Sequence, residues 1–261
     1  MEFSETRPLY LLAEVAKILR SENGCAWDKE QTPQSLKPYL IEETYELYDA
    51  IARADTVDTK EELGDLLYQI YAHAQIAMEE GNFDIDDVAA GITEKLIGRH
   101  PHVFGDIAID DADEVARQWE EIKKKEKAHR ESVLDGVPPH LPALLKAYRT
   151  QQKVARLGFD WDDFKDVVAK LDEEVAEFKE AVEQDDLAHM EDEAGDILFS
   201  LVNILRYKKI NPEEALQSTV RKFSNRFRHV EKRCAETGRD IKEFTLEELD
   251  QFWEEAKKLS T

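Results

Sequence analysis

The sequence is poor in cysteine, glycine and proline. Its 261 residues include 2 cysteines, 10 glycines and 8 prolines. With only Cys25 and Cys234, neither a disulfide framework nor a cysteine-based zinc site is indicated, and a reducing compartment fits. Scarce glycine and proline, beside abundant alanine, leucine, glutamate and lysine, predict an almost entirely α-helical chain.

Positive charge is also scarce. The chain carries 35 Lys and Arg against 58 Asp and Glu, so its formal net charge is −23. This acidity argues against binding to duplex nucleic acid or to an anionic membrane surface, since both require positive charge. No apolar run approaches the length of about eighteen residues that spans a bilayer, and we expect a soluble, cytoplasmic protein. A nucleotide substrate is still compatible, because a bound divalent ion can reverse the local field.

A pattern of acidic residues occurs twice, in the form EExxE and then, fifteen residues later, ExxD. Residues three apart share one face of a helix, so each half of the pattern directs two carboxylates the same way. Two helices joined by a short turn would bring both pairs together, and an all-oxygen ligand set suits Mg²⁺ or Mn²⁺. The acids are Glu42, Glu43, Glu46, Glu62 and Asp65 in the first copy, and Glu173, Glu174, Glu177, Glu193 and Asp196 in the second.

A single EExxE pattern more often marks a solvated helix face than a metal site. Here the acids alternate with apolar residues at helical spacing, for example Leu40, Leu47 and Leu66. This alternation places the carboxylates beside the stripe that faces the core, where solvated charge is not expected. The placement and the second copy together favour a metal site.

Other residues repeat in the same order, which indicates a duplicated domain. The offset varies from 127 residues, between Lys95 and Lys222, to 136 residues, between Lys17 and Lys153. Gly136 and three prolines cluster between the copies, so we predict domains at 1–131 and 146–261 with a linker at 132–145. In the first copy we expect helices near 9–20, 33–53, 59–80, 85–99 and 113–130, an irregular segment at 25–33, and Thr32 as an N-cap.

The ordered motifs resemble the MazG family of tandem-domain nucleoside triphosphate pyrophosphohydrolases over nearly the whole chain. One departure is Ala26, where the family form of the loop has proline. The motifs are the two acidic patterns, GCAWDKEQT at 24–32, RHPHVF at 99–104, LDGVP at 134–138 and GFDW at 158–161.

This resemblance implies an all-α fold of two four-helix units, a homodimer, and Mg²⁺-dependent cleavage of a nucleoside triphosphate into monophosphate and pyrophosphate. Glu173 would orient water or support the ligands, and Glu173, Glu174 and Glu177 would form the catalytic set. The implied metal ligands are Glu174, Glu177, Glu193 and Asp196, with Glu43, Glu46, Glu62 and Asp65 in the first copy.

A triphosphate needs cationic partners beyond a metal ion. Lys222 and Arg226 lie four residues apart, and an Arg fork fits phosphate oxygens. A basic stripe that balances an acidic protein is the alternative, but Lys95 and Arg99 repeat the spacing and favour a clamp. Further substrate-binding candidates are Asn225, Lys170, Asp196 and Trp253, of which Trp253 either stacks on a base or packs in the core.

The second copy is richer in polar residues near its acids. Asn203 and Asn225 stand where the first copy has Ala72 and Gly98. We therefore expect residues 146–261 to perform most of the catalysis and the first copy mainly to build the assembly. Two alternatives stay open, a helical scaffold protein and a sensor that binds nucleotides without hydrolysing them. The sequence does not reveal base or sugar preference, metal count or protein partners.

Overall fold

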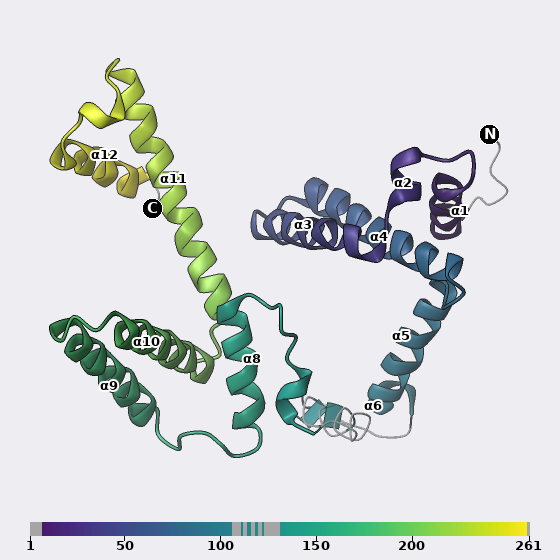
Figure 1. Cartoon of the computed structure of the whole chain (residues 1–261), viewed down its shortest axis with the longest axis horizontal. Helices are drawn as coiled ribbons and strands as arrows, with labels where there is room; N and C mark the ends of the chain where they lie inside the picture. Colours follow the sequence, from purple (N-terminus) through teal and green to yellow (C-terminus); the bar gives the residue numbers. More distant parts are fainter. Residues whose placement is uncertain are drawn as a thin grey trace. The chain divides into compact units, whose positions relative to one another are not determined.

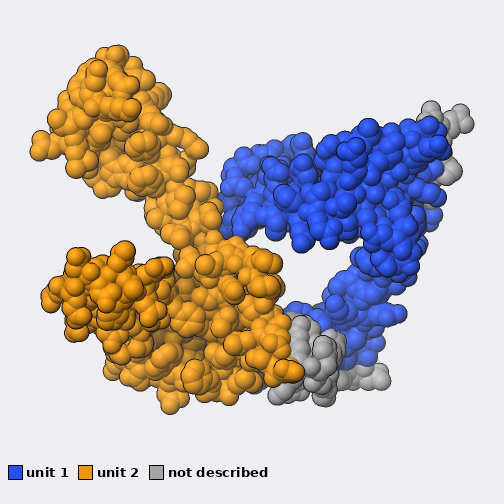
Figure 2. Space-filling model, in the orientation of Figure 1, with its two compact units in different colours: residues 1–128 blue, residues 129–261 orange. Residues whose placement is uncertain are grey.

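The computed structural model describes residues 7–105, 111, 114, 115, 118, 119, 122 and 131–259. Every element within these residues is helical and none is a strand, so the all-α prediction is confirmed. The chain separates into two compact units, Met1–Ala128 (unit 1) and His129–Thr261 (unit 2), which Figure 2 shows in different colours. The predicted domain limits at 131 and 146 stay a prediction.

Among the residues of unit 1 that the structure describes, four long helices and two short ones have defined bounds, and Figure 1 labels them. The helices predicted at 9–20, 33–53, 59–80 and 85–99 are all present, whereas the helix predicted at 113–130 falls largely outside the described residues. The expectation of an irregular segment at 25–33 was wrong in part, because one and a half helical turns form there. The helices are α1 (Pro8–Arg20), α2 (Ala26–Glu30), α3 (Pro33–Ala52), α4 (Thr56–Glu79), α5 (Ile85–Arg99) and α6 (Pro101–Phe104).

Unit 2 repeats the four long helices in the same order, with α8, α9, α10 and α11 in the places of α1, α3, α4 and α5. This order confirms the predicted tandem repeat of four-helix units. The elements are the 3₁₀ helix η1 (Val133–Gly136), α8 (Ala143–Ala155), α9 (Phe164–Glu183), α10 (Leu187–Tyr207), α11 (Pro212–Glu236), the 3₁₀ helix η2 (Ile241–Glu243) and α12 (Leu246–Leu259).

Side-chain caps fix the helix starts. The Thr32 side chain accepts a hydrogen bond from the Ser35 backbone N–H, and the Ser35 hydroxyl accepts one from the Thr32 backbone N–H, which confirms the predicted N-cap of α3. The side chain of Asn211 caps α11, whose first residue is Pro212. These caps satisfy backbone donors that have no partner within the helix.

The two acidic helix pairs turn in the same way. Ala54 follows α3 with φ of 55°, and Asp185 follows α9 with φ of 54°. In each unit the next residue, Asp55 or Asp186, accepts hydrogen bonds from the first turn of the following helix. This tight turn makes α3 antiparallel to α4 and α9 antiparallel to α10, so the acidic patterns lie side by side.

Packing within each unit leaves many large apolar side chains uncovered. In unit 1, Leu36, Ala72 and Ile76 form a buried cluster against which Tyr68 packs. On the hairpin helices of both units, by contrast, side chains such as Ile41 and Leu198 are more than half exposed. Within the described part of the chain, no helix has the length and apolarity needed to cross a membrane.

Candidate metal and substrate site

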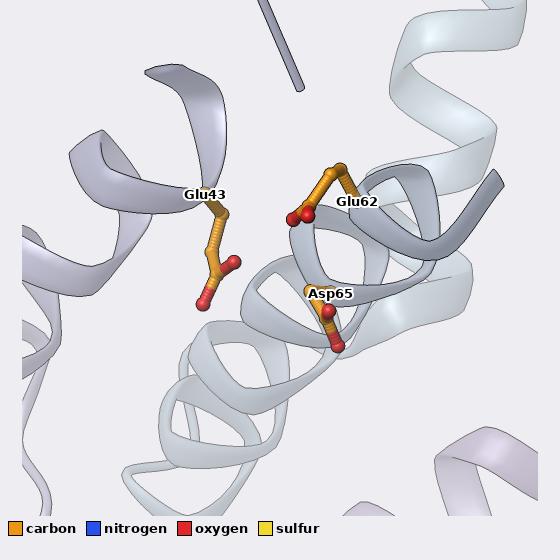
Figure 3. A group of neighbouring side chains, drawn as sticks. All are labelled: Glu43, Glu62 and Asp65. Carbon is orange, nitrogen blue, oxygen red and sulfur yellow. The ribbon is translucent and has the colours of Figure 1, made fainter. Parts of the chain in front are cut away.

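Three acids of unit 1 converge between α3 and α4. Glu43, Glu62 and Asp65 each place a carboxylate oxygen within 4.8 Å of the others, and we call this group acid cluster 1. Figure 3 shows Glu43 on one helix and Glu62 and Asp65 on its neighbour, with the Glu62 carboxylate turned toward the helix that carries Glu43. The helical period and the tight turn together produce this convergence.

Three acids of unit 2 converge in the same way between α9 and α10. Glu174, Glu177 and Glu193 form acid cluster 2, again with ligand atoms within 4.8 Å of one another. Glu174 and Glu193 are buried, and Oε2 of Glu193 has no hydrogen-bond partner. A buried carboxylate oxygen without a partner is costly, so this group of oxygens fits a bound cation.

Each cluster contains three of its four predicted ligands. The fourth acid is Glu46 in unit 1 and Asp196 in unit 2, so the two units differ in which acid stands apart. Both remaining acids lie on the same helices as their clusters. The metal-binding roles of all eight residues therefore stay predictions, with geometric support for six.

Burial and mutual repulsion raise the pKa values of three of the acids. Burial, followed by the charges of Asp65 and Glu46, raises the pKa of Glu43 above its ordinary value. Burial and the charge of Glu46 likewise raise the pKa of Glu62. In unit 2, burial and a hydrogen bond with Glu174 raise the pKa of Glu177. A cation among these acids would relieve the repulsion.

Acid cluster 2 has two close partners of its own. Lys170, predicted as a substrate contact, places Nζ 2.7 Å from Oε1 of Glu174 and 2.9 Å from Oε1 of Glu173. His189 Nε2 lies 3.1 Å from Oε1 of Glu193. The sequence reading missed His189, although its position one turn before Glu193 was a usable signal.

Acid cluster 1 has an uncharged neighbour instead. The buried side chain of Gln69 is hydrogen-bonded to Glu43, and its Oε1 has no hydrogen-bond partner. Ser200 occupies the corresponding place in unit 2. Gln69 was also missed, because nothing in its spacing distinguishes it from a core-facing polar residue.

An arginine and a tryptophan meet in each unit. Arg226 on α11 lies over the Trp253 ring of α12 at 5.9 Å, and Arg99 on α5 lies over the Trp119 ring at 5.7 Å. Phe223 contacts Trp253 at a centroid distance of 5.0 Å. Unit 2 therefore brings the predicted residues Arg226 and Trp253 together in an aromatic group that could accept a base.

The two arginines differ in accessibility. Arg99 is 8% exposed, whereas Arg226 is half-buried and its Nε has no hydrogen-bond partner. Lys95 and Lys222 are both exposed. The basic pair of unit 2 is therefore better placed to receive a ligand than that of unit 1.

The remaining polar candidates have internal partners. Asn225 is exposed, and its Oδ1 accepts a hydrogen bond from Arg228. Asn203 is buried and accepts one from Nε of Arg206, whose Nη2 pairs with Asp160. In the described part of the chain, no hydrogen bond or ion pair joins Lys222 or Arg226 to acid cluster 2.

Comparison with known proteins places this geometry in a family. Two segments, residues 31–104 and 163–231, match the MazG nucleotide pyrophosphohydrolase domain, and together they cover more than half of the chain. The chain belongs to the MazG family. The first MazG segment contains acid cluster 1 and the second contains acid cluster 2, so both clusters lie in MazG repeats.

Several relatives share nearly the whole chain. The nucleoside triphosphate pyrophosphohydrolase of Escherichia coli K12 is 44% identical over 252 residues, which are 95% of this chain and 96% of that protein. A MazG protein of Thermotoga maritima, named as a nucleoside triphosphate pyrophosphohydrolase/pyrophosphatase, is 46% identical over 94% of each chain. An uncharacterized protein of Bacillus subtilis is 50% identical over 94% of this chain but only 50% of its own length.

Proposed function

We propose that the chain is a nucleoside triphosphate pyrophosphohydrolase, which converts a ribo- or deoxynucleoside triphosphate and water into the monophosphate and pyrophosphate. The observation that carries this proposal is acid cluster 2, with two buried carboxylates and an unpartnered oxygen within a MazG repeat. The names of the E. coli and T. maritima relatives support the same reaction.

The residues fit a divalent cation, which we propose to be Mg²⁺, with Mn²⁺ as a substitute. Glu174, Glu177 and Glu193 would hold it, with Asp196 as a further ligand, because hard ions prefer carboxylate oxygens. When bound, such an ion offsets the charge of phosphate oxygens and makes water more acidic. Glu173, which is exposed next to Glu174 on α9, would orient the attacking water.

Basic and aromatic residues of unit 2 would position the nucleotide. Lys222 and Arg226 supply positive charge to the triphosphate, and Asn225 offers an amide next to them. Trp253 presents its ring beside Arg226 for base stacking. Stacking depends little on base identity, so this arrangement favours a broad base preference.

A second copy of the chain would complete the enzyme. The hairpin helices leave Leu198, Phe199 and Leu201 at least two-fifths exposed in unit 2, and Ile41 and Tyr45 are similarly uncovered in unit 1. Exposed apolar surface of this extent is typical of an interface between proteins. We propose a cytoplasmic homodimer without nucleic-acid or membrane partners, in keeping with the net charge of −23.

Unit 2 performs most of the catalysis in this proposal. Its Arg226 is only half-buried, whereas Arg99 of unit 1 is buried. Its cluster also retains the ammonium of Lys170 as a nearby positive charge. Unit 1 contributes mainly to assembly, although acid cluster 1 can still hold an ion.

Product analysis tests the reaction. The full chain is incubated with each of the common ribo- and deoxynucleoside triphosphates and Mg²⁺, and the products are separated by anion exchange. We expect monophosphate and pyrophosphate in equal amounts. Diphosphate and inorganic phosphate as products would contradict the proposal, and nucleotide binding without any product would identify a sensor instead.

A further inference from the structure

Lys170 occupies one oxygen of a carboxylate in acid cluster 2. Its Nζ lies 2.7 Å from Oε1 of Glu174, a member of acid cluster 2 whose side chain is only 6% exposed. The Lys170 side chain is 37% exposed, so the ammonium reaches the cluster from its solvent side. A second ion pair, to Glu173, holds it there. The ammonium thus neutralises part of the charge that would attract a dication.

Unit 1 lacks this arrangement at the corresponding place. Tyr39 stands four residues before Glu43, as Lys170 stands four residues before Glu174. The Tyr39 ring packs edge-on against Trp27 at 5.8 Å and carries no positive charge. Glu43 has the amide of Gln69 as its hydrogen-bond partner instead. The two clusters therefore share two equivalent acids, Glu43 with Glu174 and Glu62 with Glu193, and within the described residues only acid cluster 2 has a resident cation.

We propose that Lys170 is a resident competitor of the divalent ion at acid cluster 2, displaced when a nucleotide offers its phosphates to the ammonium. The proposal rests on the function proposed above and adds how that site is loaded. Metal and nucleotide then bind cooperatively in unit 2, because each favours the state in which Lys170 has left Glu174. Acid cluster 1, which has Tyr39 in the equivalent position, binds its ion with an affinity that does not depend on nucleotide.

The charges support an exchange of this kind. A dication that enters acid cluster 2 competes with Lys170 for the Glu174 carboxylate, and this competition lowers the apparent affinity for the dication. A triphosphate gives the released ammonium a new anionic partner and removes that penalty. Couplings between two ligands are usually 5- to 150-fold, and for one half-exposed ammonium we expect about tenfold.

Titration with Mn²⁺ without nucleotide measures the competition. The full chain carries Glu62→Gln and Asp65→Asn, so that acid cluster 1 is silent, and free Mn²⁺ is followed by its paramagnetic resonance signal. Lys170→Met is expected to tighten Mn²⁺ binding about tenfold. Lys170→Tyr, which copies unit 1, is expected to act in the same direction. Unchanged or weaker binding in both variants would overturn the proposal.

The reciprocal variant is the matched control. Tyr39→Lys, in a chain with Glu193→Gln and Asp196→Asn, leaves only acid cluster 1 to be titrated. We expect Mn²⁺ to bind this cluster more weakly than in the same chain with Tyr39. An unchanged affinity would contradict competition by an ammonium at this helical position. Circular dichroism confirms that each variant keeps its helices.

Chemical labelling follows the ammonium itself. Acetylation of Lys170, read by mass spectrometry, is expected to accelerate when Mn²⁺ is added and to slow again when an α,β-methylene triphosphate joins it. Lys165, exposed on the same helix, serves as the reference. A rate of Lys170 acetylation that does not change when Mn²⁺ is added would contradict displacement of the ammonium from Glu174.

Failure of this proposal is distinguishable from failure of the proposed function. If the wild type releases pyrophosphate but Lys170→Met leaves Mn²⁺ affinity unchanged, only the competition is wrong. If the wild type neither binds Mn²⁺ at acid cluster 2 nor releases pyrophosphate, both proposals are wrong.

Discussion

Arg20 joins three helices of unit 1, and replacing it by methionine is expected to destabilise that unit by about 3 kcal/mol. Its Nε and Nη2 donate to the Glu79 carboxylate at 3.0 and 2.8 Å, and its Nη1 donates to the backbone carbonyls of Asp28 and Gln31. Arg20 thereby ties the end of α1 to α2 and to α4, which carries Glu62 and Asp65.

The magnitude follows from the partners that the substitution would strand. A hydrogen bond to a charged group contributes about 1.5–3 kcal/mol, and breaking a fully buried ion pair costs about 3–5 kcal/mol. The Arg20 side chain is 11% exposed but that of Glu79 is 37% exposed, so water compensates part of the loss. We therefore take the lower end of the second range, which corresponds to a fall of roughly 10 °C in the melting temperature.

Urea unfolding of the full chain, with hydrogen exchange to assign each transition to a unit, measures the effect. Arg206→Met is the matched control, because Arg206 is equally buried in unit 2 and pairs with Asp160. We expect Arg20→Met to weaken unit 1 and Arg206→Met to weaken unit 2. A loss below about 1 kcal/mol, within the range of exposed ion pairs, would refute the reasoning.

Acid should narrow the difference in stability between the wild type and Arg20→Met but not abolish it, because the hydrogen bonds from Arg20 to the backbone carbonyls of Asp28 and Gln31 do not titrate. Burial raises the pKa of Glu79, but hydrogen bonds from Arg20 and Gln75 outweigh it and leave that pKa below its ordinary value of 4.5. A lowered pKa in the folded state stabilises the protein above pH 4.5, and this contribution is lost as the pH falls through the folded-state value. A difference that persists unchanged well below that pH would contradict the assignment.

Three further predictions concern the two units. Glu177→Gln should raise the stability of the metal-free protein at neutral pH. Burial and neighbouring acids raise the pKa of Glu177 in the folded state, so the ionised Glu177 carboxylate destabilises the wild type as the pH rises above 4.5. Urea unfolding without divalent ions checks this, and a lower stability of the variant would contradict it. Tyr68→Phe should cost unit 1 about 1 kcal/mol by urea unfolding. Burial and the hydrogen bond to Asp28 raise the pKa of Tyr68 to about 12, so this stabilisation should disappear as the pH rises above 10.0. An ultraviolet titration that finds no phenol ionising near pH 12 would contradict this expectation. Lys222→Ala should raise the KM for triphosphate at least about tenfold, whereas Lys95→Ala should change that KM less than about twofold. Equal effects of the two variants in steady-state assays would contradict a substrate site in unit 2.

Local sequence signals were sufficient for much of the fold. The helix at 85–99 was predicted to the residue, and the Thr32 cap was read from its position before Pro33. Convergence of the acids followed from the helical period and a short turn. Helix α2 escaped prediction because five residues are too few to show a periodic pattern.

Tertiary packing decided what the sequence could not. The spacing of four acids is the same in both units, yet Asp65 joins acid cluster 1 while Asp196 stands apart from acid cluster 2. Side-chain rotamers, which the spacing of the acids does not specify, decide which carboxylates meet. Arg99 is buried whereas Arg226 is half-buried, and this difference likewise depends on contacts between helices that are distant in sequence.

The central claim is that acid cluster 2 is the catalytic centre. Its most direct test is the rate of pyrophosphate release, with Mg²⁺ and saturating triphosphate, by the wild type, Glu177→Gln and Glu46→Gln. Each variant removes one charge at an equivalent position in the two units. We expect Glu177→Gln to lower the rate of pyrophosphate release at least about a hundredfold and Glu46→Gln to lower it less than about threefold. Equal losses in the two variants, or a loss confined to Glu46→Gln, would contradict it.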